Sequence, residues 1–131
     1  MEKMIIFVAE DQNQADNLCH VLHIHNYNTK HLQSFEMFNG LPENETMAAV
    51  IIDLDNDAIS NIDIRNFKRA NPYIPLLAVS GKLFHPELQE SMQSHIFACV
   101  SKPVDLDELI FLLNSALENG VSSINQTKGK G

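Results

Sequence analysis

The 131-residue sequence contains no tryptophan, only two cysteines, and only five glycines and five prolines. These low counts exclude collagen-like and low-complexity chains and argue against a small scaffold held together by disulfides. The unbroken apolar run at residues 4–9 is far shorter than the roughly 20 residues that a membrane-spanning helix needs, and no signal-peptide cleavage pattern follows it. The sequence therefore predicts one globular domain, cytoplasmic and without a membrane segment.

Basic residues are also scarce. Nine Lys and Arg face 17 Asp and Glu, which gives a formal net charge of -8. A surface with this charge repels phosphate backbones and anionic lipids. We therefore expect no direct nucleic-acid binding by this domain.

The two cysteines lie far apart in the sequence. Cys19 falls in a segment with helical periodicity, and Cys99 falls in an apolar segment that is typical of a core strand. We expect both thiols to be reduced and buried, and we expect no disulfide between them.

Short apolar runs are the strongest secondary-structure signal. They are rich in β-branched or aromatic residues and have no polar alternation, which predicts strands covered on both faces, as in a parallel sheet between helices. The four runs are residues 4–9, 48–52, 74–79 and 96–100. A weaker run at residues 27–32 predicts an edge strand.

Between these runs the apolar residues recur at helical spacing. After the first run they are Ala15, Leu18, Cys19 and Leu22. After the run at 48–52 they are Ile59, Ile62, Phe67 and Ala70. Strand and helix thus alternate, which predicts an open, doubly wound α/β sheet with helices on both faces.

The last helix has clear boundary signals. Asp105 stands three residues before Glu108, as in a capping box, and Gly120 is expected to end the helix. Its apolar stripe comprises Leu106, Leu109, Ile110, Leu113 and Leu117. Residues 120–131 are polar and aperiodic, which predicts a flexible tail or linker after a domain at residues 1–119.

Polar residues stand where the buried strands end. Glu10 and Asp11 follow the first strand, and the next three strands end at Asp53, Ser80 and Lys102. In open α/β sheets ligands bind beyond the carboxyl ends of the strands, so we expect these residues to share one site. Clustered carboxylates favour Mg²⁺, and a cation beside a lysine and a hydroxyl suits phosphoryl transfer to a carboxylate.

Four segments carry this pattern in order: IIFVAEDQ, VIIDLD, LLAVSG and VSKPVDLDEL. Together they resemble the receiver domain of response regulators in bacterial two-component signalling. The resemblance spans roughly residues 3–119 and implies a flavodoxin-like sheet of five parallel strands in the order 2-1-3-4-5.

The resemblance implies a phosphoprotein. Asp53 would accept a phosphoryl group from a histidine kinase or phosphotransfer protein. Glu10, Asp11 and Asp53 would hold Mg²⁺, with the backbone carbonyl of Asp55 as a further ligand.

It also implies the surroundings of the phosphoryl group. Ser80 and Lys102 would contact its oxygens, and Gly81 would leave room for the donor. The Lys102–Pro103 bond would be cis and would aim the ammonium group inward.

One departure from the pattern concerns signal output. Receivers usually carry Tyr or Phe three residues before the lysine, at a position that moves when the hydroxyl residue moves. Here that residue is Cys99, and Phe97 lies two residues earlier on the same strand face.

Three functions follow from these patterns. The first is a phosphorylated receiver, without enzymatic turnover, that switches contacts with an output domain or target protein and can form a homodimer. The second is a receiver-like interaction module that acts without phosphorylation. The third is a haloacid-dehalogenase-like phosphatase, which Asp53-Leu54-Asp55 resembles, although that family places its DxD strand near the N-terminus.

Overall fold

The computed structural model describes residues 4–41, 46–55, 59–82 and 85–130, with side chains up to residue 118. The strands are β1 (Met4–Val8), β2 (Asn28–Leu32), β3 (Met47–Asp53), β4 (Leu76–Ser80) and β5 (Ile96–Ser101). The α-helices are α1 (Gln12–Ile24), α2 (Asn61–Ala70), α3 (Gln89–Ser94) and α4 (Leu106–Lys130). Two 3₁₀ helices, η1 (Phe35–Gly40) and η2 (Pro86–Leu88), precede β3 and α3.

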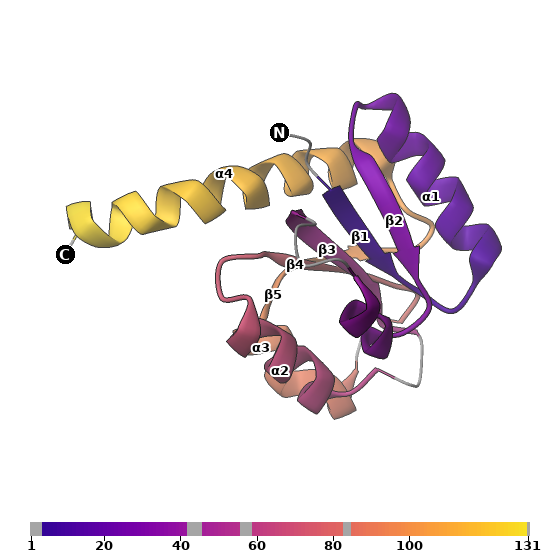
Figure 1. The fold of residues 1–131 in the computed structure, drawn as a ribbon, viewed down its shortest axis with the longest axis horizontal. Helices are drawn as coiled ribbons and strands as arrows, with labels where there is room; N and C mark the ends of the chain where they lie inside the picture. The colour runs from indigo at the N-terminus through magenta and orange to yellow at the C-terminus, as the bar shows by residue number, and fades with distance from the viewer. Residues whose placement is uncertain (1–3, 42–45, 56–58, 83–84, 131) are drawn as a thin grey trace.

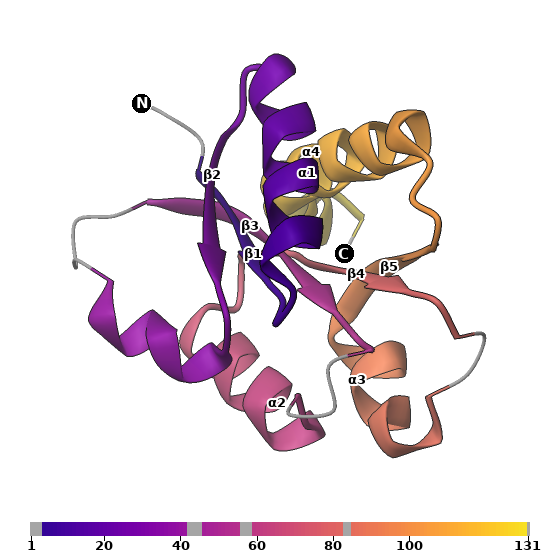
Figure 2. The ribbon, with the colours of Figure 1, turned by 90° about the vertical axis from the view of Figure 1, so that its right-hand side faces the viewer.

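The five strands form one parallel sheet in the order β2-β1-β3-β4-β5. Helices α1 and α4 cover one face, whereas η1, α2 and α3 cover the other (Figures 1 and 2). The predicted doubly wound fold and its strand order 2-1-3-4-5 are therefore confirmed.

Strand β1 shows how two cores arise from one sheet. Ile5 and Phe7 belong to the core beneath α1 and α4, and Ile6 and Val8 belong to the core beneath α2. All four are fully buried, because successive side chains of a strand point to opposite faces and both faces are covered. This is why the sequence of β1 is apolar without interruption.

Strand β5 does not follow this rule. Its apolar sequence predicts burial on both faces, but Phe97, Cys99 and Ser101 are exposed and only Val100 is fully buried. The reason is that β5 is an edge strand, so its neighbours cover it less completely. Both cysteines are free, but the prediction that both are buried is wrong: Cys99 is exposed and Cys19 is half-buried.

The predicted apolar stripe of α2 is only partly confirmed, since Phe67 and the preceding Ile59 are buried. Ile64 and Phe67 are its buried residues, whereas Ile62 is 61% exposed and Ala70 is exposed. The helix begins only after Ser60, whose side chain and that of Asp63 form a reciprocal capping box. Ile59 lies before this cap, so its spacing from Ile62 is not helical.

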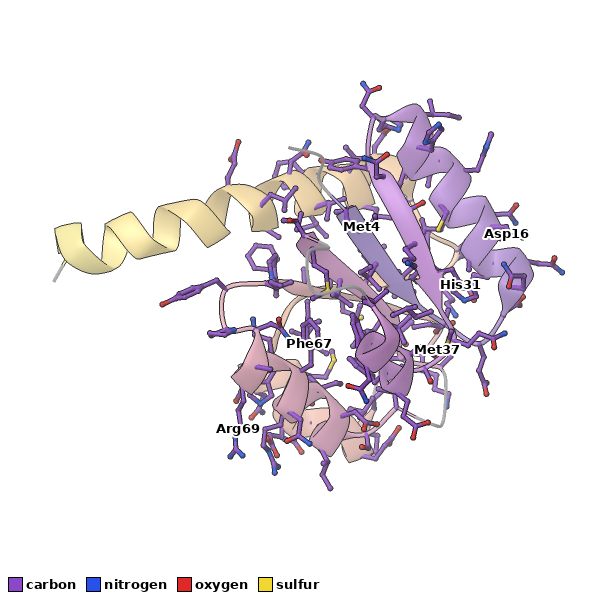
Figure 3. All side chains as sticks on the ribbon, in the orientation of Figure 1. Met4, Asp16, His31, Met37, Phe67 and Arg69 are labelled. Carbon is purple, nitrogen blue, oxygen red and sulfur yellow. The ribbon has the colours of Figure 1, made fainter. Side chains whose placement is uncertain are left out.

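A 3₁₀ helix, η1, stands between β2 and β3 in place of an α-helix. Phe35 and Phe38 are three residues apart, which puts them on the same side of a 3₁₀ helix. The centroids of their rings lie 6.0 and 5.0 Å from that of Phe67 in α2, which is labelled in Figure 3. This aromatic cluster fills the space beneath the sheet.

Helix α4 is longer than predicted. Leu109, Leu113 and Ala116 pack into the core, but the helix runs on to Lys130 and extends away from the sheet (Figure 1). The prediction that Gly120 ends it is therefore wrong, because a single glycine costs only about 1 kcal/mol in a helix. A flexible tail or linker at residues 120–131 stays a prediction. Within the described residues, no helix is both long and apolar enough to cross a membrane.

Candidate functional site

Asp53 is the last residue of β3 and the central group of the site. It is 5% exposed, unusually low for an aspartate, because it follows the buried residues 49–52 of β3, which lies between β1 and β4. Its Oδ1 accepts hydrogen bonds from Lys102 Nζ at 2.9 Å and from the Asp55 N–H at 2.9 Å. Burying a carboxylate is costly unless a cation lies beside it. Here the cation comes from the end of β5, which is separated from β3 by β4.

Lys102 provides that cation. Its backbone N–H donates to the Ser80 carbonyl at 2.8 Å, and the Lys102–Pro103 peptide bond is cis, as expected. Its ammonium group lies 2.9 Å from Asp53 Oδ1 and 2.9 Å from Asp55 Oδ2. Burial lowers the pKa of Lys102, but the hydrogen bonds and charges of the two carboxylates outweigh this and raise it above its usual value.

Gln14 completes the contacts of the ammonium group. With its amide nitrogen towards Asp53, Gln14 donates to Asp53 Oδ2 at 2.9 Å and accepts from Lys102 Nζ at 3.1 Å. The three protons of the ammonium group therefore have three acceptors. Gln14 lies in the first turn of α1. Nothing in the sequence around it predicts that it contacts Asp53 and Lys102.

The side chain of Asp55 also enters the site, whereas the resemblance assigns a role only to its carbonyl. Asp55 Oδ2 accepts from the Gly81 N–H at 2.8 Å and from Lys102 Nζ, and Oδ1 lies 3.4 Å from Ser80 Oγ. Burial raises the pKa of Asp55, but the hydrogen bonds from Lys102 and Gly81 and the nearby positive charge together lower it below its usual value. Asp55 is therefore an ionised carboxylate held by donors from β4 and β5.

Ser80 ends β4 and is 2% exposed. Its Oγ lies 2.5 Å from His85 Nε2, donates to the Lys82 carbonyl at 3.0 Å and accepts from the Lys82 N–H at 3.0 Å. A hydroxyl has one proton to donate, so with that proton on Lys82 the imidazole must donate from Nε2. His85 Nδ1 is then a buried atom without a hydrogen-bond partner.

The predicted metal ligands do not assemble. Asp11 is exposed, and its Oδ1 caps α1 by accepting from the Asn13 and Gln14 N–H groups at 2.9 and 3.3 Å. Glu10 is exposed as well. Among the described residues, no three His, Cys, Asp or Glu side chains are placed to hold a metal ion. Magnesium binding by Glu10, Asp11 and Asp53 therefore stays a prediction.

The structure therefore gathers Asp53, Asp55, Ser80, Gly81 and Lys102, and leaves Glu10 and Asp11 at the rim. Cys99 lies on the exposed face of β5 together with Phe97, which is 41% exposed. Burial, followed by the charge of Asp55, raises the pKa of the Cys99 thiol. The aromatic residue usual at this position is thus replaced by a small, largely protonated thiol beside the site.

Several solved structures of receiver domains have the same fold. The chain is similar to the CheY-like receiver domain protein from Methanospirillum hungatei JF-1, with 17% identity, a TM-score of 0.82, and coverage of 94% of this chain and 99% of that one. It is equally similar to the signal receiver domain of an HD domain-containing protein from Pseudomonas fluorescens Pf-5, with 18% identity, a TM-score of 0.82, and coverage of 93% and 99%. Response regulator StyR matches with 12% identity and a TM-score of 0.77 over 99% of this chain and 66% of StyR, so this chain spans just under two thirds of that protein.

The fold and the order of the strands are those of receiver domains of the response-regulator class. The sequence profile described as "Flagellar regulatory protein FleQ" matches residues 4–118. The chain therefore belongs to the FleQ family. A comparison with curated proteins found no match.

Proposed function

We propose that this receiver domain accepts a phosphoryl group on Asp53 and thereby regulates an output domain or a partner protein. The contact between Lys102 Nζ and Asp53 Oδ1 at 2.9 Å is the observation that supports this most directly. It places a permanent cation beside a buried carboxylate, where charge develops as a phosphoryl group arrives. The name of the family suggests that the regulated process is flagellar.

The transfer would use the carboxylate as nucleophile. An Asp53 carboxylate oxygen forms the new P–O bond while the P–N bond of a phosphohistidine breaks, and the released imidazole takes up a proton. The donor would be a histidine kinase or a phosphotransfer protein. Lys102 stays protonated and neutralises the phosphoryl oxygens, and Gln14 orients Asp53 Oδ2 through its amide.

Magnesium remains a separate variable. Glu10 and Asp11 are its candidate ligands beside Asp53, and a divalent cation would supply further neutralisation of the phosphoryl charge. The described geometry brings no three ligands together, so no step is derived through the metal.

A second candidate function is regulation without phosphorylation. The observation that favours it is the saturation of Lys102, whose ammonium group already contacts Asp53, Asp55 and the Gln14 amide. Because Lys102 already neutralises the carboxylates of the site, such a domain can signal through contacts with a partner protein and without phosphorylation.

The test is direct phosphorylation with a small donor, acetyl phosphate, with and without Mg²⁺, followed by intact mass measurement. We expect one phosphoryl group on the wild type, released by hydroxylamine as an acyl phosphate should be, and none on Asp53→Asn. Glu118→Gln is the control, since Glu118 is an exposed carboxylate about 18 Å along α4 from Leu106.

Other outcomes separate the alternatives. No incorporation under any condition, together with intact folding, would support the module that acts without phosphorylation. Continued release of phosphate from simple phosphomonoesters would support the phosphatase instead, and the non-enzymatic proposal would then fail.

A further inference from the structure

Three polar groups converge beside Asp53. The Gly81 N–H, just after β4, and the Lys102 ammonium group, just after β5, both donate to Asp55, and the Ser80 hydroxyl lies beside them with its Oγ 3.4 Å from Asp55 Oδ1. An N–H, a hydroxyl and a cation that face one point form a site for a small oxyanion. In this structure the group at that point is the carboxylate of Asp55.

The fit of the carboxylate is close. Asp55 Oδ2 lies 2.8 Å from the Gly81 nitrogen and 2.9 Å from Lys102 Nζ, while Oδ1 lies 3.4 Å from Ser80 Oγ and 3.9 Å from His85 Nε2. The Asp55 carboxylate can come this close to the Gly81 nitrogen because Gly81 has no side chain. A Cβ there would stand 3.2 Å from Asp55 Oδ2, closer than ordinary van der Waals contact.

This oxyanion site adjoins Asp53 directly, because Asp53 Oδ1 and Asp55 Oδ2 share the same ammonium group. A phosphoryl group on Asp53 would bring about one and a half to two further negative charges to the site. Two anions in one set of donors repel each other, and the donors cannot satisfy both. The Asp55 carboxylate and an incoming oxyanion therefore exclude one another.

We infer that Asp55 is a built-in competitor for the oxyanion site formed by Ser80, Gly81 and Lys102, and that its carboxylate must leave before a phosphoryl group or another small oxyanion can bind there. The inference that Asp55 competes with a phosphoryl group rests on the function proposed above. The inference that it competes with free oxyanions rests only on the geometry of the donors.

The first measurement avoids phosphorylation altogether. Inorganic phosphate is titrated into the protein at constant ionic strength, and the amide signal of Gly81 is followed by NMR. We expect Asp55→Ala to bind phosphate about tenfold more tightly than the wild type or better, because a like charge is removed and the donors are vacated. Glu118→Gln removes a distant carboxylate and should leave the affinity unchanged.

A further variant approaches the same contact differently. Asp55→Asn keeps the shape but removes the charge, so its phosphate affinity should lie between those of the wild type and Asp55→Ala. Thermal unfolding of each variant shows that it is folded, and Asp55→Asn tests the inference if Asp55→Ala does not fold.

The second measurement is the rate of Asp53 phosphorylation by acetyl phosphate in the same variants. Faster incorporation in Asp55→Ala, with tighter phosphate binding, supports both the competitor and the proposed function. Tighter phosphate binding without incorporation on Asp53 supports the competitor and overturns phosphorylation. Equal phosphate affinity in all folded variants overturns the competitor, even if Asp53 is phosphorylated.

Discussion

The replacement Lys102→Met tests the electrostatic account of the site. Methionine keeps most of the length of the lysine side chain but removes the cation that Asp53 and Asp55 share. It leaves two neighbouring carboxylates without their counter-ion, one of them almost completely buried. We expect a marked loss of stability that depends on pH.

The size of the loss follows from the burial of the groups. Removing one partner of a fully buried ion pair costs about 3–5 kcal/mol, whereas exposed pairs contribute about 0–1 kcal/mol. The side chains of Lys102 and Asp55 are 24% and 27% exposed, and that of Asp53 is 8% exposed. An intermediate cost of about 2 kcal/mol is therefore expected, which lowers Tm by roughly 6–8 °C in a domain of this size.

The pH dependence has a definite sign. The pKa of Asp55 is lowered in the folded protein, so its stabilisation is present above its ordinary pKa and is lost as the pH falls through the folded value. The pKa of Lys102 is raised, so its stabilisation is present below its ordinary pKa and is lost as the pH rises through the folded value. In Lys102→Met the unpaired Asp55 carboxylate binds a proton more readily, and the difference from the wild type should shrink between about pH 7 and about pH 4.

Urea unfolding at the two pH values measures this difference. Arg69→Met is the control, because Arg69 points outward from α2 (Figure 3) and its loss should change the stability by about 0.5 kcal/mol or less. Asp53→Asn should cost less than about 1 kcal/mol, since it leaves the Lys102–Asp55 pair and removes an excess negative charge. A Lys102→Met protein as stable as the wild type, or equally destabilised at both pH values, would refute the reasoning.

Two other predictions concern α2. Ser60→Ala should cost about 1 kcal/mol in urea unfolding, because it removes the side-chain oxygen that caps the helix, and a loss below about 0.3 kcal/mol would contradict the cap. Glu90 in α3 has its pKa lowered to about 2, chiefly by its hydrogen bonds from Arg65 in α2. Its carboxyl signal in an NMR titration should therefore move to the ordinary glutamate range in Arg65→Met, and an unchanged titration would show that the pair does not form in solution. Any stabilisation from this pair is present above the ordinary pKa of Glu90 and is lost as the pH falls towards 2.

The fold was predictable because its signals are local and repeated. Uninterrupted apolar runs such as that of β1 identify strands buried on both faces. The prediction of burial failed at β5, because whether a strand lies at the edge of the sheet depends on the order of the strands and not on the apolar run itself. Helix α4 was recognised by its stripe but not by its end. Gly120 lowers helix propensity without forbidding a helix, so its presence gave no reliable boundary.

The candidate site was predictable only in part. The strand-end residues Asp53, Ser80 and Lys102 do meet, because parallel strands end at one edge of the sheet. The roles of Gln14 and His85 depend on side-chain directions that no spacing encodes. Asp55 was expected to contribute its carbonyl, and its carboxylate enters the site because of a contact with a glycine 26 residues further along the chain.

The continuous α4 gives the domain a mechanical property. Its first three turns are anchored in the core through Leu109, Leu113 and Ala116, and the next 14 residues extend for about 21 Å beyond Ala116. A tilt of roughly 10° at the anchored part would move the far end of such a rod by roughly 4 Å. A shift of roughly 1–2 Å at the ends of the anchored part would thus be amplified by simple leverage into a displacement that a neighbouring protein surface can detect.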